Sequence, residues 1–177
     1  MFSAEYKGRI LDFFGGGDSR GFSPEGMDVI ISLNSPCNTV LANFPLESFK
    51  NNSIKVVYLP VEDYEAPKYT KEFLLGLLDS IIKVIEKDPI AIAVKCTGGH
   101  GRTGTILAAY LGILTDVKDP VKYLREVYCK NAVETIEQIE YIEKVTGKKT
   151  KESPSRTRWL SSFKSFFDDD ILFYYYD

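Results

Sequence analysis

Three short apolar segments of the chain have the pattern of buried β-strands. Residues 27–33, 54–59 and 90–94 are rich in Val, Ile and Leu, and Gly, Asn or Pro stands beside each of them. Continuous apolar runs of this length are typical of strands that are covered on both faces. We therefore predict three buried strands.

A run of glycines follows the first short segment of the chain, residues 8–14. Gly15, Gly16 and Gly17 stand there in succession, with Asp18 next. Glycine reaches backbone conformations that other residues avoid, and Asp is common in turns. The run therefore predicts a flexible turn.

Two segments predict helices from the spacing of their apolar residues and from their position. Between residues 70 and 86, apolar side chains recur every three or four positions, which is typical of an amphipathic helix. A second helix is expected from Arg102 or Thr103 to Leu114.

Two later helices have start signals. Asp119-Pro120 fits an N-cap followed by proline at the first helical position. Thr135 and Gln138 have the spacing of a capping box, and Gly147 marks the end of that helix. Strands that alternate with helices in this way predict an α/β fold, a single domain with a central, mostly parallel sheet flanked by helices.

The 177 residues divide by composition into a domain and a tail. The predicted domain covers residues 1–148, whereas residues 149–177 are basic, then aromatic, then acidic. The tail is either a last helix over about residues 156–167, packed on the domain and followed by a frayed end, or a docking or self-association segment.

Charge and hydropathy exclude several classes of protein. The net charge of −3 argues against the broad basic surface of a nucleic-acid binder, although a local basic pocket remains compatible with it. No apolar run approaches the roughly 18 residues of a membrane span, and residues 1–7 lack the pattern of a secretory signal. We expect a cytoplasmic, monomeric protein with no nucleic-acid or membrane partner.

The cysteines argue against a disulfide framework and against a metal centre. Cys37, Cys96 and Cys129 are an odd number in a chain without a secretory signal, and no two of them have C-x-x-C spacing. The single His excludes zinc sites built from His pairs. We therefore expect no metal and no cofactor.

The segment from Cys96 to Gly104 has the pattern of an anion-binding loop with a nucleophile. A buried strand leads into Cys96, glycines follow at 98, 99 and 101, and a helix begins just beyond. Successive backbone N–H groups and the amino end of a helix bind a tetrahedral anion, and Arg102 can hold two of its oxygens. A thiol beside such positive charge is expected as the nucleophilic thiolate. An inert Cys in a glycine-rich turn would leave Arg102 unexplained.

These residues resemble the cysteine-dependent protein tyrosine phosphatase superfamily. Cys96, five intervening residues, Arg102 and Thr103 match its C-x5-R-[ST] signature, and the run Cys-Thr-Gly-Gly-His-Gly-Arg-Thr-Gly-Thr is similar to the compact dual-specificity-like and archaeal members. The resemblance implies metal-independent hydrolysis of phosphotyrosine in proteins through a cysteinyl-phosphate intermediate, with phosphoserine and phosphothreonine left open. It implies that the Thr103 hydroxyl hydrogen-bonds the Cys96 sulfur. The substrate-binding residues that it implies are Thr97, Gly98, Gly99, His100, Gly101, Arg102 and Gln138.

A second resemblance concerns the general acid. The loop of residues 60–67 follows a predicted strand, as the acid loop of the family does, and Asp63 aligns with the acid. A leaving oxygen departs faster when a positioned side chain protonates it. Glu62 and Glu65 are alternatives within the same loop.

A third resemblance covers residues 131–138, which are similar to the family segment before the last core helix. Gln138 there is a capping-box partner of Thr135, a residue that positions water, or both.

Four residues depart from the family pattern or have more than one interpretation. Most relatives have His before the nucleophile, where this chain has Lys95, which strand alternation places opposite Cys96. Lys95 would either favour the thiolate or extend to solvent. His100 is expected at the pocket mouth without a role in proton transfer. Cys37 and Cys129 are expected to be structural, with a disulfide to oxidised Cys96 as the alternative.

Two other functions are compatible with the loop. An RNA 5′-triphosphatase would use the same residues but needs a basic groove, against which the acidic balance of the chain weighs. An inactive phosphotyrosine-binding module would normally lack Cys, Arg or the acid, and all three are present.

Overall fold

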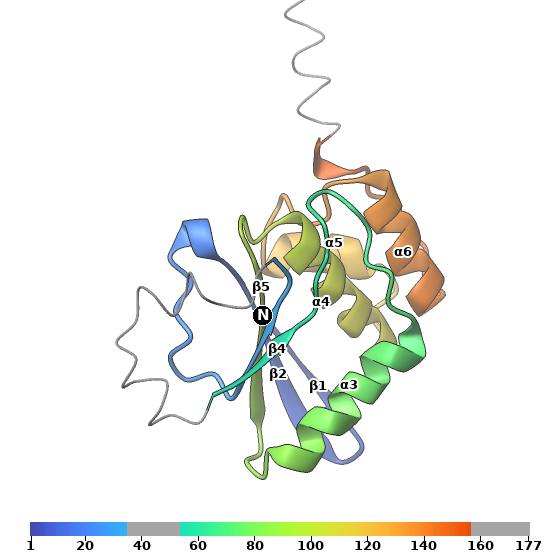
Figure 1. Cartoon of the computed structure of the whole chain (residues 1–177). Coiled ribbons are helices and arrows are strands. Elements are labelled where there is room, and N and C mark those ends of the chain that lie inside the picture. The colour runs from blue at the N-terminus through green and yellow to red at the C-terminus, as the bar shows by residue number, and fades with distance from the viewer. Residues whose placement is uncertain (35–53, 157–177) are drawn as a thin grey trace, which may run out of the picture.

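Within the part of the chain that the structure describes, five strands form one sheet in the order β1-β2-β5-β3-β4 (Figure 1). The computed structural model describes residues 1–34 and 54–156. Only β1 is antiparallel to its neighbour, whereas β2, β5, β3 and β4 run parallel. The predicted α/β class with a mostly parallel sheet is therefore confirmed. The strands are β1 Phe2–Tyr6, β2 Arg9–Gly17, β3 Val29–Ser32, β4 Lys55–Tyr58 and β5 Ile90–Cys96.

The central strand, β5, is buried along its whole length. It pairs with β2 on one side and with β3 on the other, so its backbone hydrogen bonds are made within the sheet. The three predicted strands are present, with ends that differ from the predicted ones by a few residues. The hairpin of β1 and β2, which turns at Lys7 and Gly8 with positive φ, was not predicted.

The glycine run lies inside strand β2, so the predicted flexible turn is wrong. Gly15, Gly16 and Gly17 pair with the last three residues of β5. Close packing explains why these positions lack side chains: a Cβ on Gly15 would lie 2.4 Å from the Tyr128 ring, and one on Gly17 would lie 2.5 Å from the amide nitrogen of Gly99. Gly17 therefore lets the loop after β5 approach β2 backbone to backbone.

All four predicted helices are present, and the sheet and helices make two layers (Figure 1). Side-chain oxygens of Thr70, Asp119 and Thr135 accept backbone N–H groups at the starts of α3, α5 and α6. The predicted capping box is complete, and Gly147 ends α6 in the left-handed conformation. The helices are α3 Lys71–Val84, α4 Gly101–Leu114, α5 Pro120–Val127 and α6 Ile136–Thr146.

Helix α4 is the centre of the helical layer. It is buried from Gly101 to Gly112, because the sheet covers one side and α5 and α6 cover others. Tyr110 is fully buried: its ring stacks on Phe13 at 5.1 Å between centroids, and its hydroxyl donates to the Leu74 carbonyl. This packing holds α4 against the sheet, and the loop of residues 97–100 joins its amino end to the end of β5.

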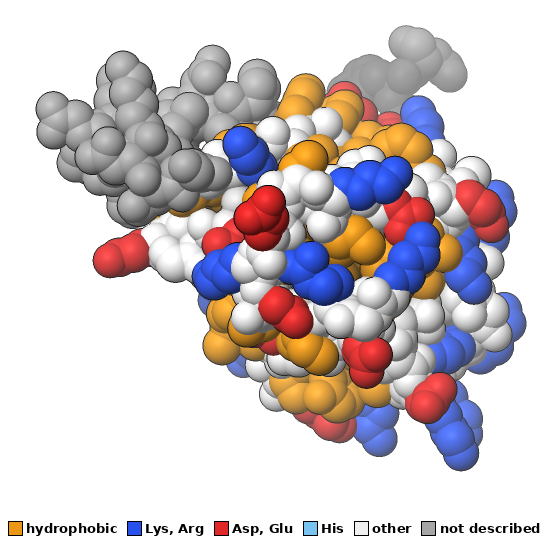
Figure 2. All heavy atoms as spheres, turned by 90° about the horizontal axis from the view of Figure 1, so that it is seen from below, with side chains coloured by type: hydrophobic (Ala, Val, Ile, Leu, Met, Phe, Trp, Pro, Cys, Tyr) orange, Lys and Arg blue, Asp and Glu red, His pale blue; other side chains and the backbone are white. Residues whose placement is uncertain are grey.

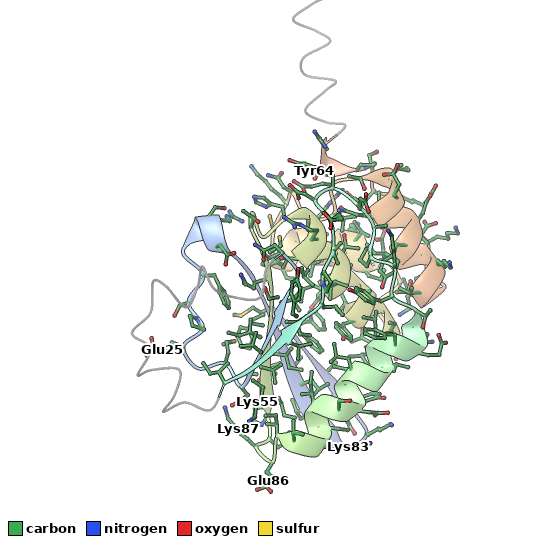
Figure 3. All side chains as sticks on the ribbon, in the orientation of Figure 1. Glu25, Lys55, Tyr64, Lys83, Glu86 and Lys87 are labelled. Atoms are coloured by element: carbon green, nitrogen blue, oxygen red, sulfur yellow. The ribbon has the colours of Figure 1, made fainter. Side chains whose placement is uncertain are left out.

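The face opposite that end carries charges of both signs. Seen from below, Lys and Arg side chains alternate with Asp and Glu, and hydrophobic patches lie between them (Figure 2). Glu86 and Lys87 lie at this end of the molecule, whereas Tyr64 lies at the other (Figure 3). On this face the described residues therefore form no continuous basic surface of the kind that binds nucleic acid. Nowhere in residues 1–34 and 54–156 is a helix both long and apolar enough to span a membrane.

Two parts of the sequence predictions lie outside the described residues. They are Cys37 and the last helix expected over about residues 156–167, of which only residue 156 is described. Of the predicted tail, residues 149–156 are described, and several of them hydrogen-bond to the domain.

Gly76→Ala is expected to stabilise the protein. Gly76 lies in the middle of α3, is exposed, and has open space where a Cβ would stand. Alanine there lowers the conformational entropy of the unfolded chain, which should raise the free energy of unfolding by roughly 0.5–1 kcal/mol. Gly147→Ala is the control with the opposite sign, because φ is 69° at that position. Equal effects of the two substitutions in urea unfolding would contradict the explanation.

Candidate active site

The loop between β5 and α4 places a cysteine beside a backbone amide and close to the amino end of a helix. Cys96 ends β5 and is 2% exposed, and α4 begins at Gly101. Gly99 has φ of 72°, a conformation that favours glycine, and its amide nitrogen lies 3.2 Å from the Cys96 sulfur. This N–H group and the amino end of α4 both stabilise negative charge on the sulfur.

Tyr128 holds the loop from the side of α5. Its hydroxyl donates to the Gly99 carbonyl at 2.5 Å. Burial, the largest cause, raises the pKa of Tyr128, so the hydroxyl stays protonated and remains a donor at neutral pH. The loop is thus held between this hydroxyl and the glycines of β2.

Arg102 joins the loop to a second loop, residues 60–67, which follows β4. The guanidinium is buried, with Nη1 donating to the Val61 carbonyl at 3.2 Å. Its Nη2 donates to Thr97 Oγ1 at 3.3 Å and pairs with Asp63 Oδ1 at 3.0 Å. The structure therefore brings Arg102 and Asp63 together beside the residue that follows Cys96.

Of the acidic side chains in the described loop of residues 60–67, Asp63 is the one that pairs with Arg102. Its side chain is 60% exposed, so it also faces solvent above the guanidinium. Tyr64, the next residue, has φ of 64°, a left-handed conformation that is uncommon for a residue with a Cβ. The backbone thus turns sharply just after Asp63.

Gln138 has the predicted capping role and an additional contact. Its Oε1 accepts the N–H groups of Glu134 at 2.8 Å and Thr135 at 3.3 Å. Its Nε2 donates to the Glu65 carbonyl at 3.2 Å. The buried amide therefore ties the Asp63 loop to the start of α6, a contact between distant segments that the sequence did not indicate.

The predicted hydrogen bond from Thr103 to the Cys96 sulfur is wrong. The Thr103 hydroxyl donates instead to the carbonyl of Gly16 in β2, at 3.2 Å. Because α4 already begins at Gly101, Thr103 lies within the first turn, and a hydroxyl has one proton to donate. Its contribution is to fix α4 on the sheet.

Lys95 does not extend to solvent, so that one of its two predicted roles is wrong. Its side chain is 0% exposed, and Nζ lies 2.8 Å from both carboxylate oxygens of Asp18. A buried cation of this kind needs a counter-charge, which η1 (Asp18–Arg20) supplies.

The buried ion pair continues into the Cys96 loop. Asn34 Nδ2 donates to Asp18 and to Thr97 Oγ1, both at 3.0 Å. The backbone N–H and the hydroxyl of Ser19 both donate to the Thr97 carbonyl, at 3.0 and 2.9 Å. The residue after Cys96 is thus braced by side chains from two other loops.

His100, which was expected at the pocket mouth, contacts Cys129. Its Nδ1 lies 3.0 Å from the Cys129 sulfur. Burial, and then the nearby positive charge of Arg20, lower the pKa of His100, so the ring is neutral at pH 7. His100 therefore adds no positive charge to the loop. Cys129 is buried, as predicted, and Cys96 and Cys129 are both free thiols.

Glu134 is a site residue that the sequence analysis missed. It lies so close to Gly101 that a Cβ on the glycine would collide with Oε2 of Glu134. Burial, and then the negative charge of Asp63, raise the pKa of this carboxyl. A second carboxyl group thus lies at the amino end of α4. Its only signal in the sequence was its place beside the capping box.

The described residues contain no group of three or more His, Cys, Asp or Glu side chains arranged to hold a metal ion.

Comparison with known proteins relates this arrangement to a family. A family model described as "PTP-SAK: Swiss Army Knife protein, DSP-PTPase phosphatase domain" matches residues 25–161 of the chain. Uncharacterized protein MJ0215 of Methanocaldococcus jannaschii is 45% identical over 89 residues, which are 50% of this chain and 54% of that protein. The chain spans a little over half the length of the curated relatives it matches.

Solved structures share the fold. Tk-PTP in its active form superposes with a TM-score of 0.55 at 24% identity, over 82% of this chain and 96% of that one. Kinase associated phosphatase, with its catalytic cysteine replaced by serine, gives a TM-score of 0.52 at 16% identity, over 75% and 83%. At these identities the likeness establishes the fold.

Asp18→Asn is expected to destabilise the protein by about 3–5 kcal/mol, because it leaves the buried Lys95 cation without its counter-charge. The double variant Asp18→Asn, Lys95→Met removes both charges and should lose less than Asp18→Asn alone. Urea unfolding of wild type, both single variants and the double variant completes the cycle. Additive losses would show that the two side chains do not interact.

Glu134→Gln is expected to change the pH dependence of stability. Because the pKa of Glu134 is raised on folding, the folded chain holds this proton more tightly than the unfolded chain. Wild type should therefore lose stability relative to Glu134→Gln as the pH rises from below the unfolded pKa through the folded one. The measurement is the melting temperature of each protein between pH 4 and pH 8. The melting temperature of Glu134→Gln minus that of wild type should become more positive as the pH rises. A difference in melting temperature that stays constant with pH would contradict a raised pKa of Glu134.

Proposed function

The chain belongs to the DSP-PTPase phosphatase domain family, and from this we propose that it hydrolyses phosphotyrosine in proteins through a cysteinyl-phosphate intermediate on Cys96. Phosphoserine and phosphothreonine are the further substrates to be tested. The observation that carries the proposal is the placement of Arg102, whose guanidinium contacts both Asp63 and the residue next to Cys96.

In the first step, the Cys96 sulfur attacks phosphorus. The S–P bond forms as the bond from phosphorus to the leaving oxygen breaks, and Asp63 gives that oxygen its proton. Support comes from the Gly99 N–H at 3.2 Å from the sulfur, which stabilises the anion before attack. The loop amides and Arg102 hold the equatorial oxygens, where charge develops in the transition state.

In the second step, water attacks the phosphocysteine. Asp63, now a carboxylate, takes a proton from the water; the P–O bond forms and the S–P bond breaks, which returns the Cys96 thiolate and releases phosphate. Protein donors supply the charge stabilisation at each stage, so the proposed reaction needs no metal.

Para-nitrophenyl phosphate tests the nucleophile, and a phosphotyrosine peptide tests the acid. Wild type should hydrolyse it in the presence of a metal chelator and be inhibited by vanadate, and Cys96→Ser should abolish turnover. Asp63→Asn should lower kcat on phosphotyrosine peptide by roughly 10²–10⁴, the usual contribution of a general acid. Glu62→Gln is the matched control, because in the part of the chain that the structure describes this exposed neighbour forms no ion pair with Arg102. Full kcat in Asp63→Asn would show that another group is the acid.

A substrate panel tests the substrate class. We expect higher kcat/KM for phosphotyrosine peptides than for triphosphorylated RNA, since the chain has a net charge of −3. Preference for the RNA would make the protein a 5′-triphosphatase. Binding of phosphotyrosine peptide without Cys96-dependent hydrolysis would make it a binding module.

A further inference from the structure

Residues 152–156 lie across the two loops that carry the carboxyl groups of the site, and we call this segment the strap. The strap lies beside residues 131–134, which precede α6, and Arg156 at its end reaches the Asp63 loop. Three hydrogen bonds join the strap to residues 131–134: Ser155 N to Val133 O at 3.2 Å, Arg156 N to Glu134 O at 3.3 Å, and Ser155 Oγ to Asn131 O at 2.9 Å.

Arg125 of α5 anchors the start of the strap. Its side chain is 9% exposed and pairs with Glu152 Oε2 at 2.7 Å. The same guanidinium donates to the carbonyls of Ala132 and Val133, both at 3.0 Å. One buried cation therefore holds the strap and residues 131–134 together, so the position of Arg156 is defined from the core.

Arg156 covers the residue that follows Asp63. Its guanidinium carbon lies 4.0 Å from the centroid of the Tyr64 ring, a cation–π distance. Tyr64 is at the top of the molecule in Figure 3, beside the strap, and is 44% exposed. The Arg156 contact is thus made where the Asp63 loop meets solvent.

Both loops have a strained backbone at the point where the strap meets them. Tyr64 and Val133 have φ of 64°, and they stand directly after Asp63 and directly before Glu134. Left-handed backbone is costly for residues with a Cβ, above all for a β-branched one, and persists only where the surroundings hold it. The contacts of the strap supply such a hold at both positions.

We propose that Arg156 is a positioning residue for general-acid catalysis. By stacking on Tyr64 it keeps the backbone turn after Asp63, and with it the Asp63 carboxyl, 3.0 Å from Arg102, where the acid meets the leaving oxygen. This role rests on the proposed phosphatase function. It predicts that loss of Arg156 weakens proton donation and leaves phosphate binding intact.

Substrates with different leaving groups test this role. In Arg156→Ala, kcat/KM for phenyl phosphate, whose leaving group needs the proton, should fall roughly three- to tenfold, the equivalent of a lost cation–π contact. For 2,4-dinitrophenyl phosphate, whose leaving group departs unprotonated, the loss should stay under about twofold. The inhibition constant of vanadate should not change. Arg156→Lys should restore part of the phenyl phosphate activity, because lysine also stacks on an aromatic ring.

Controls separate positioning from folding and from substrate binding. Tyr64→Ala should reproduce the selective loss, Tyr64→Phe should not, and Tyr64→Ala combined with Arg156→Ala should lose no more than either alone. Lys151→Ala, which removes an exposed cation just before the strap, should behave as wild type. Melting temperatures verify that each variant is folded.

The outcomes that overturn the proposal are distinct. Equal losses on both substrates, or weaker vanadate inhibition, would make Arg156 a substrate-binding residue. No loss in Arg156→Ala, where Asp63→Asn does lose activity on phenyl phosphate, would show that the strap does not position the acid. Absence of Cys96-dependent hydrolysis in wild type would overturn the phosphatase function itself, and this role with it.

Discussion

The site depends on one buried guanidinium that makes contacts in three directions. Arg102 extends from the first turn of α4 to the Val61 carbonyl, to Thr97 beside the cysteine, and to Asp63. A buried cation needs a hydrogen-bond acceptor for each of its N–H groups, and this need fixes the positions of the acceptors around it. The Asp63 loop, the Cys96 loop and α4 therefore form a single unit. An anion bound above Cys96 would be a further hydrogen-bond acceptor for the Arg102 guanidinium.

Rigid backbone contacts support this unit from below. Gly17 of β2 allows the Cys96 loop to lie directly against the strand, and the Tyr128 hydroxyl holds the loop from the other side. The ion pair of Lys95 with Asp18 stands directly before Cys96 in the sequence, and through Asn34 it reaches Thr97. The loop is thus braced by charge and amide groups, with an aromatic hydroxyl on one side.

The acidic side of the site is built differently. Asp63 and Glu134 lie on loops with strained backbone, and these loops are held by side chains from elsewhere: Gln138, Arg125 and Arg156. Such loops store energy that their contacts must offset, which is common where a catalytic group must be held in one orientation. Close backbone packing therefore holds the Cys96 loop, whereas contacts from side chains hold the loops of Asp63 and Glu134.

The sequence by itself determined what local interactions decide. Apolar periodicity and caps located the central strands and all four helices, and the spacing of Cys96 and Arg102 across a glycine loop indicated the chemistry, because each depends on residues a few positions apart. Only the tertiary structure decided what distant segments do to one another. Glycines that resemble a turn became a strand because a loop and an aromatic ring pack onto them. The Thr103 hydroxyl donates to the Gly16 carbonyl, and Lys95 forms an ion pair with Asp18, 77 residues away. Which partner a buried polar group takes depends on strand register and helix packing, and no short-range pattern encodes either.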